Sequence, residues 1–143
     1  MPSDPVITGR CYCGACRISA TSPPQVVTYC HCADCRRSSG SAVACFAAFD
    51  EAAVTLTGPA VPSAGAAAGV ERLFCRACGT PIAARYAYLP RQVYVSHGCL
   101  DQAAAYPPDM HAHFDERLPW VVAEDGLPKS TGSGRAALSP GGD

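Results

Sequence analysis

Short apolar stretches of strand length recur along the chain at intervals of about ten residues. The clearest, Gln92–Ser96, alternates apolar and polar side chains, as a strand with one solvent-facing side does. Turn-forming runs such as Ser22-Pro23-Pro24 separate neighbouring stretches. The pattern predicts strands over residues 17–20, 26–29, 43–49, 54–57, 72–74, 81–88, 92–96 and 120–123.

Helices have little room in this pattern, because 13 Pro and 13 Gly interrupt most of the chain. One helical turn is expected over residues 101–105, with Asp101 as its N-cap. His111 and His113 lie two residues apart in a further candidate strand, which would place both side chains on one face. The predicted fold class is mainly β, with very little helix.

A length of 143 residues is that of one domain. We expect a leader over residues 1–8, a single folded domain over residues 9–128, and a disordered tail over residues 129–143, which are rich in Gly, Ser and Pro. Residues 59–70 are mostly small or turn-forming and are predicted to be a flexible loop.

Composition argues against two classes of partner. The formal net charge is −1, from 11 Lys plus Arg against 12 Asp plus Glu, so no basic surface is expected for nucleic acid. The longest apolar run, residues 42–49, is far shorter than the roughly 20 residues that span a bilayer. We therefore expect neither a nucleic-acid nor a membrane partner, and the oligomeric state stays open.

Ten cysteines admit two interpretations, a disulfide framework or metal binding. The first five residues have neither the basic start nor the apolar segment of an export signal. Several pairs of cysteines are separated by only one or two other residues. At this spacing a disulfide is strained, but thiolates can converge on a cation. We expect zinc, and a cytoplasmic location in which the thiols stay reduced.

Two of the cysteine turns are followed directly by glycine, which can adopt the positive φ that points backbone N–H groups at sulfur. These turns predict one closed, structural four-sulfur site, made by Cys11, Cys13, Cys75 and Cys78. An alternative uses Cys16 in place of Cys11.

The central turn differs, because Arg36 rather than glycine follows its last cysteine. Three ligands with an open fourth position are typical of a reactive zinc. The predicted ligands are Cys30, Cys32 and Cys35. The alternative is that Cys45, Cys99 or His31 closes the site and makes it structural.

The spaced motifs resemble those of the glutathione-dependent formaldehyde-activating enzymes, a family that includes the centromere protein V domain. The motifs are Gly9-x-Cys11-x-Cys13-Gly14, Cys30-His31-Cys32-x-x-Cys35-Arg36 and Phe74-Cys75-x-x-Cys78-Gly79-Thr80. The resemblance implies a zinc-bearing β-tent fold with two zinc ions per chain, one structural on the Cys11 set and one catalytic on the Cys30 set.

The resemblance also implies a function. It points to a carbon–sulfur lyase, similar to S-hydroxymethylglutathione synthase, that adds a thiol such as glutathione to formaldehyde or a related small aldehyde. Arg36 matches the family motif and is a candidate catalytic residue; either Arg36 or Arg37 can hold substrate carboxylates. The alternative is a catalytically silent zinc module that binds a protein partner or a small thiol.

Two departures from the family pattern bear on this function. Family members usually carry a polar stretch before the Phe-Cys motif, whereas residues 63–70 are almost all Ala and Gly, so the substrate-binding face is expected to be altered. Cys99 stands where a threonine or another small residue is more usual, so it is either a packed substitute or an extra reactive thiol.

Overall fold

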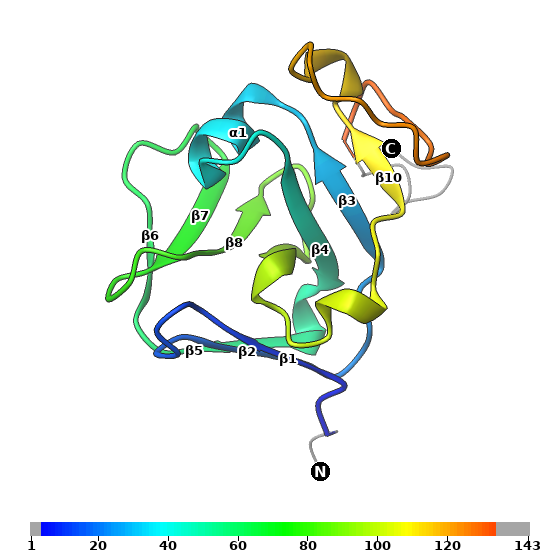
Figure 1. Ribbon diagram of the computed structural model, residues 1–143. Helices are drawn as coiled ribbons and strands as arrows, with labels where there is room; N and C mark the ends of the chain where they lie inside the picture. Colours follow the sequence, from blue (N-terminus) through cyan, green and yellow to red (C-terminus); the bar gives the residue numbers. More distant parts are fainter. Residues whose placement is uncertain (1–3, 134–143) are drawn as a thin grey trace.

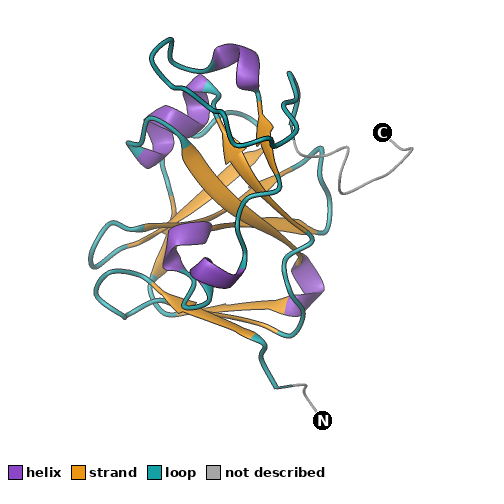
Figure 2. Cartoon of the chain, turned by 45° about the vertical axis from the view of Figure 1, so that its right-hand side comes forward, coloured by secondary structure: helices purple, strands orange, loops and turns teal. Residues whose placement is uncertain are grey.

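The computed structural model describes residues 4–133, which form two β-sheets and one short α-helix. A three-stranded antiparallel sheet has the order β1-β2-β5, with β1 at Ile7–Arg10, β2 at Arg17–Ala20 and β5 at Val54–Thr57. Figure 2 shows it as a separate layer at the bottom of the molecule.

The larger sheet has seven strands in the order β10-β3-β4-β9-β8-β7-β6. All of its pairs are antiparallel except β10 with β3. The strands are β3 (Val26–Cys30), β4 (Ala44–Asp50), β6 (Ala60–Pro62), β7 (Val70–Cys75), β8 (Pro81–Tyr86), β9 (Gln92–Ser96) and β10 (Met110–Ala112). Helix α1 (Ala33–Ser39) lies on the side away from the small sheet (Figure 1).

Both faces of the large sheet are covered, and alternate residues of its strands go to opposite sides. In β4, Ala47 and Phe49 belong to the main core with Ile18 of the small sheet. Phe46 and Ala48 belong to a second cluster with Cys30 and Cys35. The residues on this second face, rather than those of the main core, surround the candidate site.

The mainly β prediction with very little helix is confirmed, and three of the predicted strands have the observed bounds: 17–20, 54–57 and 92–96. Residues 120–123 are wrong as a strand, because they form a turn and extended chain without a strand partner. The predicted loop at 59–70 contains β6, and the turn expected at 101–105 is a 3-10 helix over Ala103–Ala105 without a side-chain cap.

The structure extends the folded part at both ends of the predicted domain. Strand β1 begins at Ile7, within the segment predicted to be a leader. At the other end, Ser130 donates its backbone N–H to the carbonyl of His111 at 2.8 Å, so the first residues of the predicted tail pack along β10. Residues 134–143 of that tail lie outside the described residues. None of the helices between residues 4 and 133 has the length and apolar character to cross a membrane.

The turn between β5 and β6 depends on a glycine. Gly58 has a φ of +96°, and a Cβ built on it would lie 2.1 Å from the carbonyl oxygen of Ala15. Gly65 has a similar φ of +81°, but a Cβ there would meet nothing within 4 Å. An alanine at position 58 would therefore meet both backbone strain and a steric clash, whereas an alanine at position 65 would meet backbone strain alone.

We predict that Gly58→Ala lowers the free energy of unfolding by more than about 2 kcal/mol, because it combines a left-handed backbone with a clash against backbone atoms. Gly65→Ala, which has the strain alone, should cost about 1 kcal/mol. Chemical denaturation of the two variants beside the parent protein measures the difference. Equal losses would show that the close approach at Ala15 is not what restricts position 58.

Candidate active site

The four cysteines predicted to form a closed site do come together. Cys11 and Cys13 follow β1, while Cys75 ends β7 and Cys78 precedes β8, and their Sγ atoms all lie within 4.8 Å of one another. The Sγ atom of Cys13 is 3.7 Å from that of Cys11 and 3.9 Å from that of Cys75. Sulfurs placed tetrahedrally at about 2.3 Å from a central zinc would be about 3.8 Å apart, so this group can hold a metal ion.

The turns of this first cluster have matched geometry. Gly14 and Gly79 both adopt a φ of +83°, as expected from their place after the second cysteine of each turn. The turns aim backbone donors at sulfur: the N–H of Ala15 lies 3.4 Å from Cys13 Sγ, and that of Cys78 lies 3.4 Å from Cys75 Sγ. These donors disperse the negative charge that thiolates bring to the site.

Cys16 is a neighbour of the first cluster and not one of its four members. It is buried, and its backbone N–H donates to the Sγ atom of Cys11 at 3.3 Å. The alternative pairing with Cys16 in place of Cys11 is therefore wrong in this structure.

The Cys78 thiol of the first cluster is stabilised in its ionised form. Hydrogen bonds from the hydroxyl and backbone of Thr80 lower the pKa of Cys78 to about 5.

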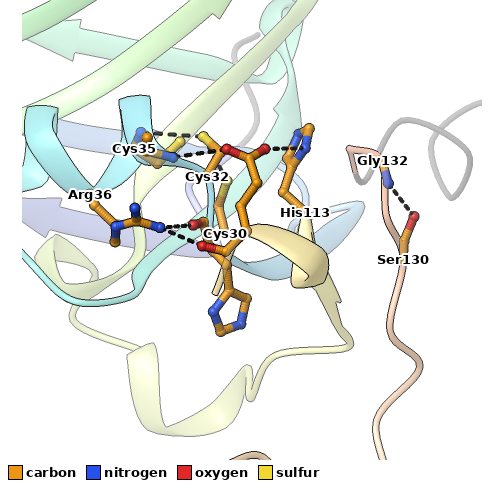
Figure 3. A network of polar contacts seen from close by, with 10 residues as sticks. Cys30, Cys32, Cys35, Arg36, His113, Ser130 and Gly132 are labelled. Atoms are coloured by element: carbon orange, nitrogen blue, oxygen red, sulfur yellow. Dashed lines mark hydrogen bonds and ion pairs between the residues drawn. The ribbon is translucent and has the colours of Figure 1, made fainter. Parts of the chain in front are cut away.

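The second cluster joins the end of β3 to the start of α1. Cys30 is the last residue of β3, Cys32 is the N-cap of α1, and Cys35 lies in the first turn of the helix. The Cys32 Sγ atom accepts the Cys35 N–H at 3.3 Å and is 3.5 Å from the Cys30 Sγ atom. All three sulfurs lie within 4.8 Å of one another, so this group too can hold a metal ion (Figure 3).

The three thiols of the second cluster are close enough that ionisation of one opposes ionisation of the others. Hydrogen bonds from the Cys30 and Cys35 thiols lower the pKa of Cys32 to about 2. The hydrogen bond to Cys32 in turn raises the pKa of Cys30 far above its usual range. Ionising all three thiols therefore requires a positive ion among them.

The residues considered as a fourth ligand lie elsewhere. Cys45 is on the other face of β4, because Ala44 pairs directly with Cys30 and successive residues alternate. The Cys99 Sγ atom is 3.8 Å from the Pro81 carbonyl, and burial, with the Cys11 and Cys78 thiolates, raises its pKa. Cys99 therefore lies toward the first cluster. Within residues 4–133, the group at Cys30 consists of three sulfurs.

His31 is turned away from the sulfurs that flank it in the sequence. Its Nε2 atom lies 2.8 Å from Nδ1 of His111, and the Nε2 atom of His111 lies 2.8 Å from the Asp125 carboxylate. Because the carboxylate accepts, His111 carries its proton on Nε2 and accepts one hydrogen bond from His31. Burial lowers the pKa of His31, which keeps the ring neutral. The chain of hydrogen bonds runs from buried His31 and His111 to the exposed Asp125 carboxylate, and it holds His31 away from the sulfurs of Cys30 and Cys32.

His113 does not share a face with His111, contrary to the expectation from their spacing. Strand β10 ends at Ala112, and His113 follows with a φ of +51°. Its Nδ1 atom lies 3.5 Å from the Glu116 carboxylate, beside the second cluster (Figure 3).

A pocket of about 320 Å³ opens beside the second cluster. Strand register explains which side chains reach it: Phe46 pairs with Thr28, Tyr94 with Ala48, and Tyr86 with Val70, all on the face that carries Cys30. The lining comprises the three cysteines, His113, Glu116 and a set of sheet and loop residues that includes Thr28, Phe46, Val70, Arg72, Tyr86, Tyr88, Tyr94 and Ala112.

Arg72 is the basic residue of this pocket, and sequence reasoning missed it. Its guanidinium group lies 5.8 Å from the centre of the Tyr86 ring, and the Tyr86 and Cys35 side chains raise the pKa of Arg72. An arginine in a strand ordinarily indicates a solvent-facing side, so period-two alternation alone could not assign Arg72 to a pocket. The available signal was an arginine two residues before the Phe-Cys motif.

Arg36, the predicted catalytic arginine, is held by backbone carbonyls. Its Nη1 atom donates to the carbonyl of His31 at 2.6 Å and to that of Glu116 at 2.7 Å (Figure 3). These bonds join the loop of the second cluster to the segment after β10. Arg36 does not line the pocket in this structure, and its catalytic role stays a prediction.

A second hollow of about 640 Å³ adjoins the pocket, since both are lined by Asp34, Phe46, Val70 and Arg72. Its other walls include Arg37, Ser38, Ser39 and the residues of 63–67. The small residues of that loop, whose composition departs from the family pattern, therefore border the candidate site.

Comparisons with known proteins agree with this architecture. A crystal structure of a Rhodobacter sphaeroides protein, a structural genomics target, superposes with a TM-score of 0.52 at 19% sequence identity, covering 87% of this chain and 99% of that chain. This likeness shows a shared fold. No curated protein sequence matches the chain.

The family model described as "Glutathione-dependent formaldehyde-activating enzyme" matches residues 6–116. The match covers most of the chain, including both cysteine clusters and the strands between them. The chain therefore belongs to the glutathione-dependent formaldehyde-activating enzyme family.

Proposed function

We propose that this protein is a zinc-dependent carbon–sulfur lyase, or aldehyde-activating enzyme, which adds a thiol such as glutathione to formaldehyde or a related small aldehyde. The observation that carries the proposal is the three-sulfur group of Cys30, Cys32 and Cys35, open on one side to a pocket. A purely structural site would be closed by a fourth protein ligand. Family membership supports the reaction class.

Both cysteine clusters suit zinc, and we propose two zinc ions per chain. Soft thiolates in groups of three or four, at separations near those of a tetrahedron, select zinc over hard cations. The first cluster has a complete set of four ligands and would be structural. The second has three and would be catalytic. Zinc bound there supplies the positive charge that keeps a substrate thiol ionised near neutral pH.

The reaction forms one carbon–sulfur bond and needs no oxidant. Sulfur attacks the aldehyde carbon, the carbonyl π electrons move to oxygen, and the proton lost by the thiol is returned to that oxygen. The reverse reaction breaks the same bond and releases both substrates. Arg72 supplies positive charge in the pocket where negative charge develops on oxygen. His113, paired with Glu116, is placed to carry a proton.

The second hollow suits the remainder of a thiol such as glutathione. Arg37 and the hydroxyl-bearing residues Ser38 and Ser39 line it, and such groups bind carboxylates and amides. Arg72 lies where the hollow meets the pocket. A small thiol and an aldehyde are therefore the proposed partners, without nucleic acid. We also propose a reducing, cytoplasmic location, which would keep the cysteines reduced and available to zinc.

We predict two zinc ions of unequal lability. The open three-sulfur site offers a chelator a route of attack, which the closed four-sulfur site does not. Metal analysis should give two equivalents, and a mild chelator should remove one well before the other, leaving the circular dichroism spectrum unchanged. A single equivalent, or loss of both together with unfolding, would contradict the assignment of two kinds of site.

Replacing one ligand in each cluster should have different consequences. Cys78→Ser should unfold the domain, because structural zinc contributes on the order of 10 kcal/mol, comparable with the whole stability of a small domain. Cys32→Ser should abolish activity but cost only about 1 kcal/mol of stability, since serine can still cap α1. Thermal melting and activity separate the two. Melting of Cys78→Ser at the parent temperature would refute the structural role of its cluster.

The open position can be tested with cobalt in place of zinc. Adding glutathione should change the sulfur-to-cobalt charge-transfer band, and affinity should rise with pH toward the pKa of the free thiol, because the ionised thiol binds. S-methylglutathione, which has no ionisable thiol, is the matched negative control. Cys99→Ala should respond as the parent does.

Two results of the cobalt experiment would count against the proposal. If the parent ignores glutathione and Cys99→Ala responds, a protein sulfur closes the site and the silent zinc module is favoured. If neither responds, glutathione is not the thiol.

A further inference from the structure

The pocket beside the Cys30 cluster is much larger than a one-carbon aldehyde. Its volume is about 320 Å³. Formaldehyde has two heavy atoms and is comparable in size with water, which occupies about 30 Å³ in the liquid, whereas an apolar cavity of about 150 Å³ is enough to bind benzene. Formaldehyde would leave most of this space to solvent, and an aldehyde with a ring would fill it.

Aromatic rings form much of the pocket wall. The Tyr94 ring packs edge-on against Tyr86, with centroids 5.5 Å apart, and against Phe46, with centroids 6.4 Å apart. The Tyr88 ring lies 5.7 Å from Tyr86. Tyr94 and Phe46 are buried, so their positions are fixed by the sheet, while Tyr88 is 51% exposed at the rim. The faces and edges of these rings can make stacked and edge-to-face contacts with the ring of an aromatic ligand.

One polar atom in this wall has no partner. The hydroxyl of Tyr94 is buried, the residue is only 6% exposed, and no hydrogen bond reaches the hydroxyl from the described part of the chain. A buried hydroxyl without a partner is costly, and native structures rarely leave one unless a ligand or water satisfies it.

The Tyr94 hydroxyl is also near the reacting centre. Tyr94 and Cys30 belong to one buried side-chain cluster and line the same pocket. Burial raises the pKa of Tyr94, so its hydroxyl remains a hydrogen-bond donor throughout the neutral range. A donor in the wall of the pocket that Cys30 also lines is available to the oxygen of an aldehyde bound there.

We propose that the aldehyde substrate carries an aromatic ring, which lies between the rings of Phe46, Tyr86 and Tyr88, and that the Tyr94 hydroxyl donates a hydrogen bond to the aldehyde oxygen. This inference rests on the proposed thiol addition. When the carbon–sulfur bond forms, the oxygen takes the carbonyl electron pair and is held by the tyrosine until it receives the proton that the thiol lost.

The substrate class can be tested by binding, separately from catalysis. Benzamide and acetamide have the carbonyl group of benzaldehyde and acetaldehyde but do not add thiols. Titrated into the zinc-loaded protein and followed by NMR, benzamide should bind at least about tenfold more tightly than acetamide, as expected for burying a ring. Binding of benzamide no tighter than acetamide would overturn the inference.

Catalysis supplies the second arm. Exchange NMR measures how fast glutathione adds to benzaldehyde, acetaldehyde and formaldehyde, with and without protein. The inference predicts the largest acceleration with benzaldehyde. Acceleration with formaldehyde and acetaldehyde but not benzaldehyde would overturn it and leave the proposed function standing. Acceleration of none of the three would overturn both.

The role of the hydroxyl is tested by Tyr94→Phe. Because this hydroxyl has no protein partner, its removal should leave the melting temperature unchanged or higher. The acceleration of thiol addition should nevertheless fall by about 100-fold, the contribution typical of a positioned acid. The matched control is Tyr106→Phe, a tyrosine outside the pocket, which should keep full activity. Full activity in Tyr94→Phe would overturn the role of Tyr94, and a lower melting temperature with proportional loss of activity would indicate a structural role.

Discussion

The pairing of β3 with β4 determines which side of the large sheet each functional residue faces. Cys30 lies opposite Ala44, so the next residue, Cys45, must point to the other side. Shifting this register by one residue would exchange the two faces, moving Phe46 into the main core and Phe49 toward the Cys30 cluster. Because both faces are buried, such a shift would greatly lower the free energy of unfolding. The register is therefore fixed, and with it the positions of the residues around the site.

The two cysteine clusters meet the problem of concentrated thiolate charge in different ways. In the first, backbone N–H groups of Ala15, Cys16 and Cys78 reach the sulfurs from tight turns. In the second, Cys35 supplies one such donor and an arginine stands beside the sulfurs. In the first cluster, N–H groups of the adjacent turns disperse the negative charge of the thiolates. That arrangement suits a fixed cross-link between the turns. The second leaves room for an incoming molecule.

Much of this could be predicted from the sequence, because the relevant information is local. Spacing identified both groups of cysteines that the fold brings together, and Gly14 and Gly79 separated the two kinds of turn through the backbone conformation that each requires. Alternation located the strand Gln92–Ser96, but the side expected to face solvent is covered, because Tyr94 is buried like Val93 and Val95. Helix α1 was missed because its seven residues include four that are poor helix formers, and the cap that starts it is a cysteine sulfur.

The parts that sequence could not predict depend on distant segments. Arg72 and Tyr94 belong to different strands, and nothing in either strand alone reveals that they border one pocket. Arg36 matches the family motif, but its side chain donates a hydrogen bond to the carbonyl of Glu116, 80 residues away. The sequence around Arg36 could not reveal that contact. The separation of His111 from His113 depends on where β10 ends, a point set by its partner strand rather than by its own residues.

The parallel pairing of β10 with β3 also affects how the protein folds. Met110 lies beside Thr28, and His111 contacts His31 across 80 residues of chain. A parallel pair cannot form through a short turn, and closing so long a loop costs conformational entropy before its contacts are gained. The wall that β10 contributes to the site is thus a long-range element, whose contacts must offset the entropy lost in closing the chain between Cys30 and Met110.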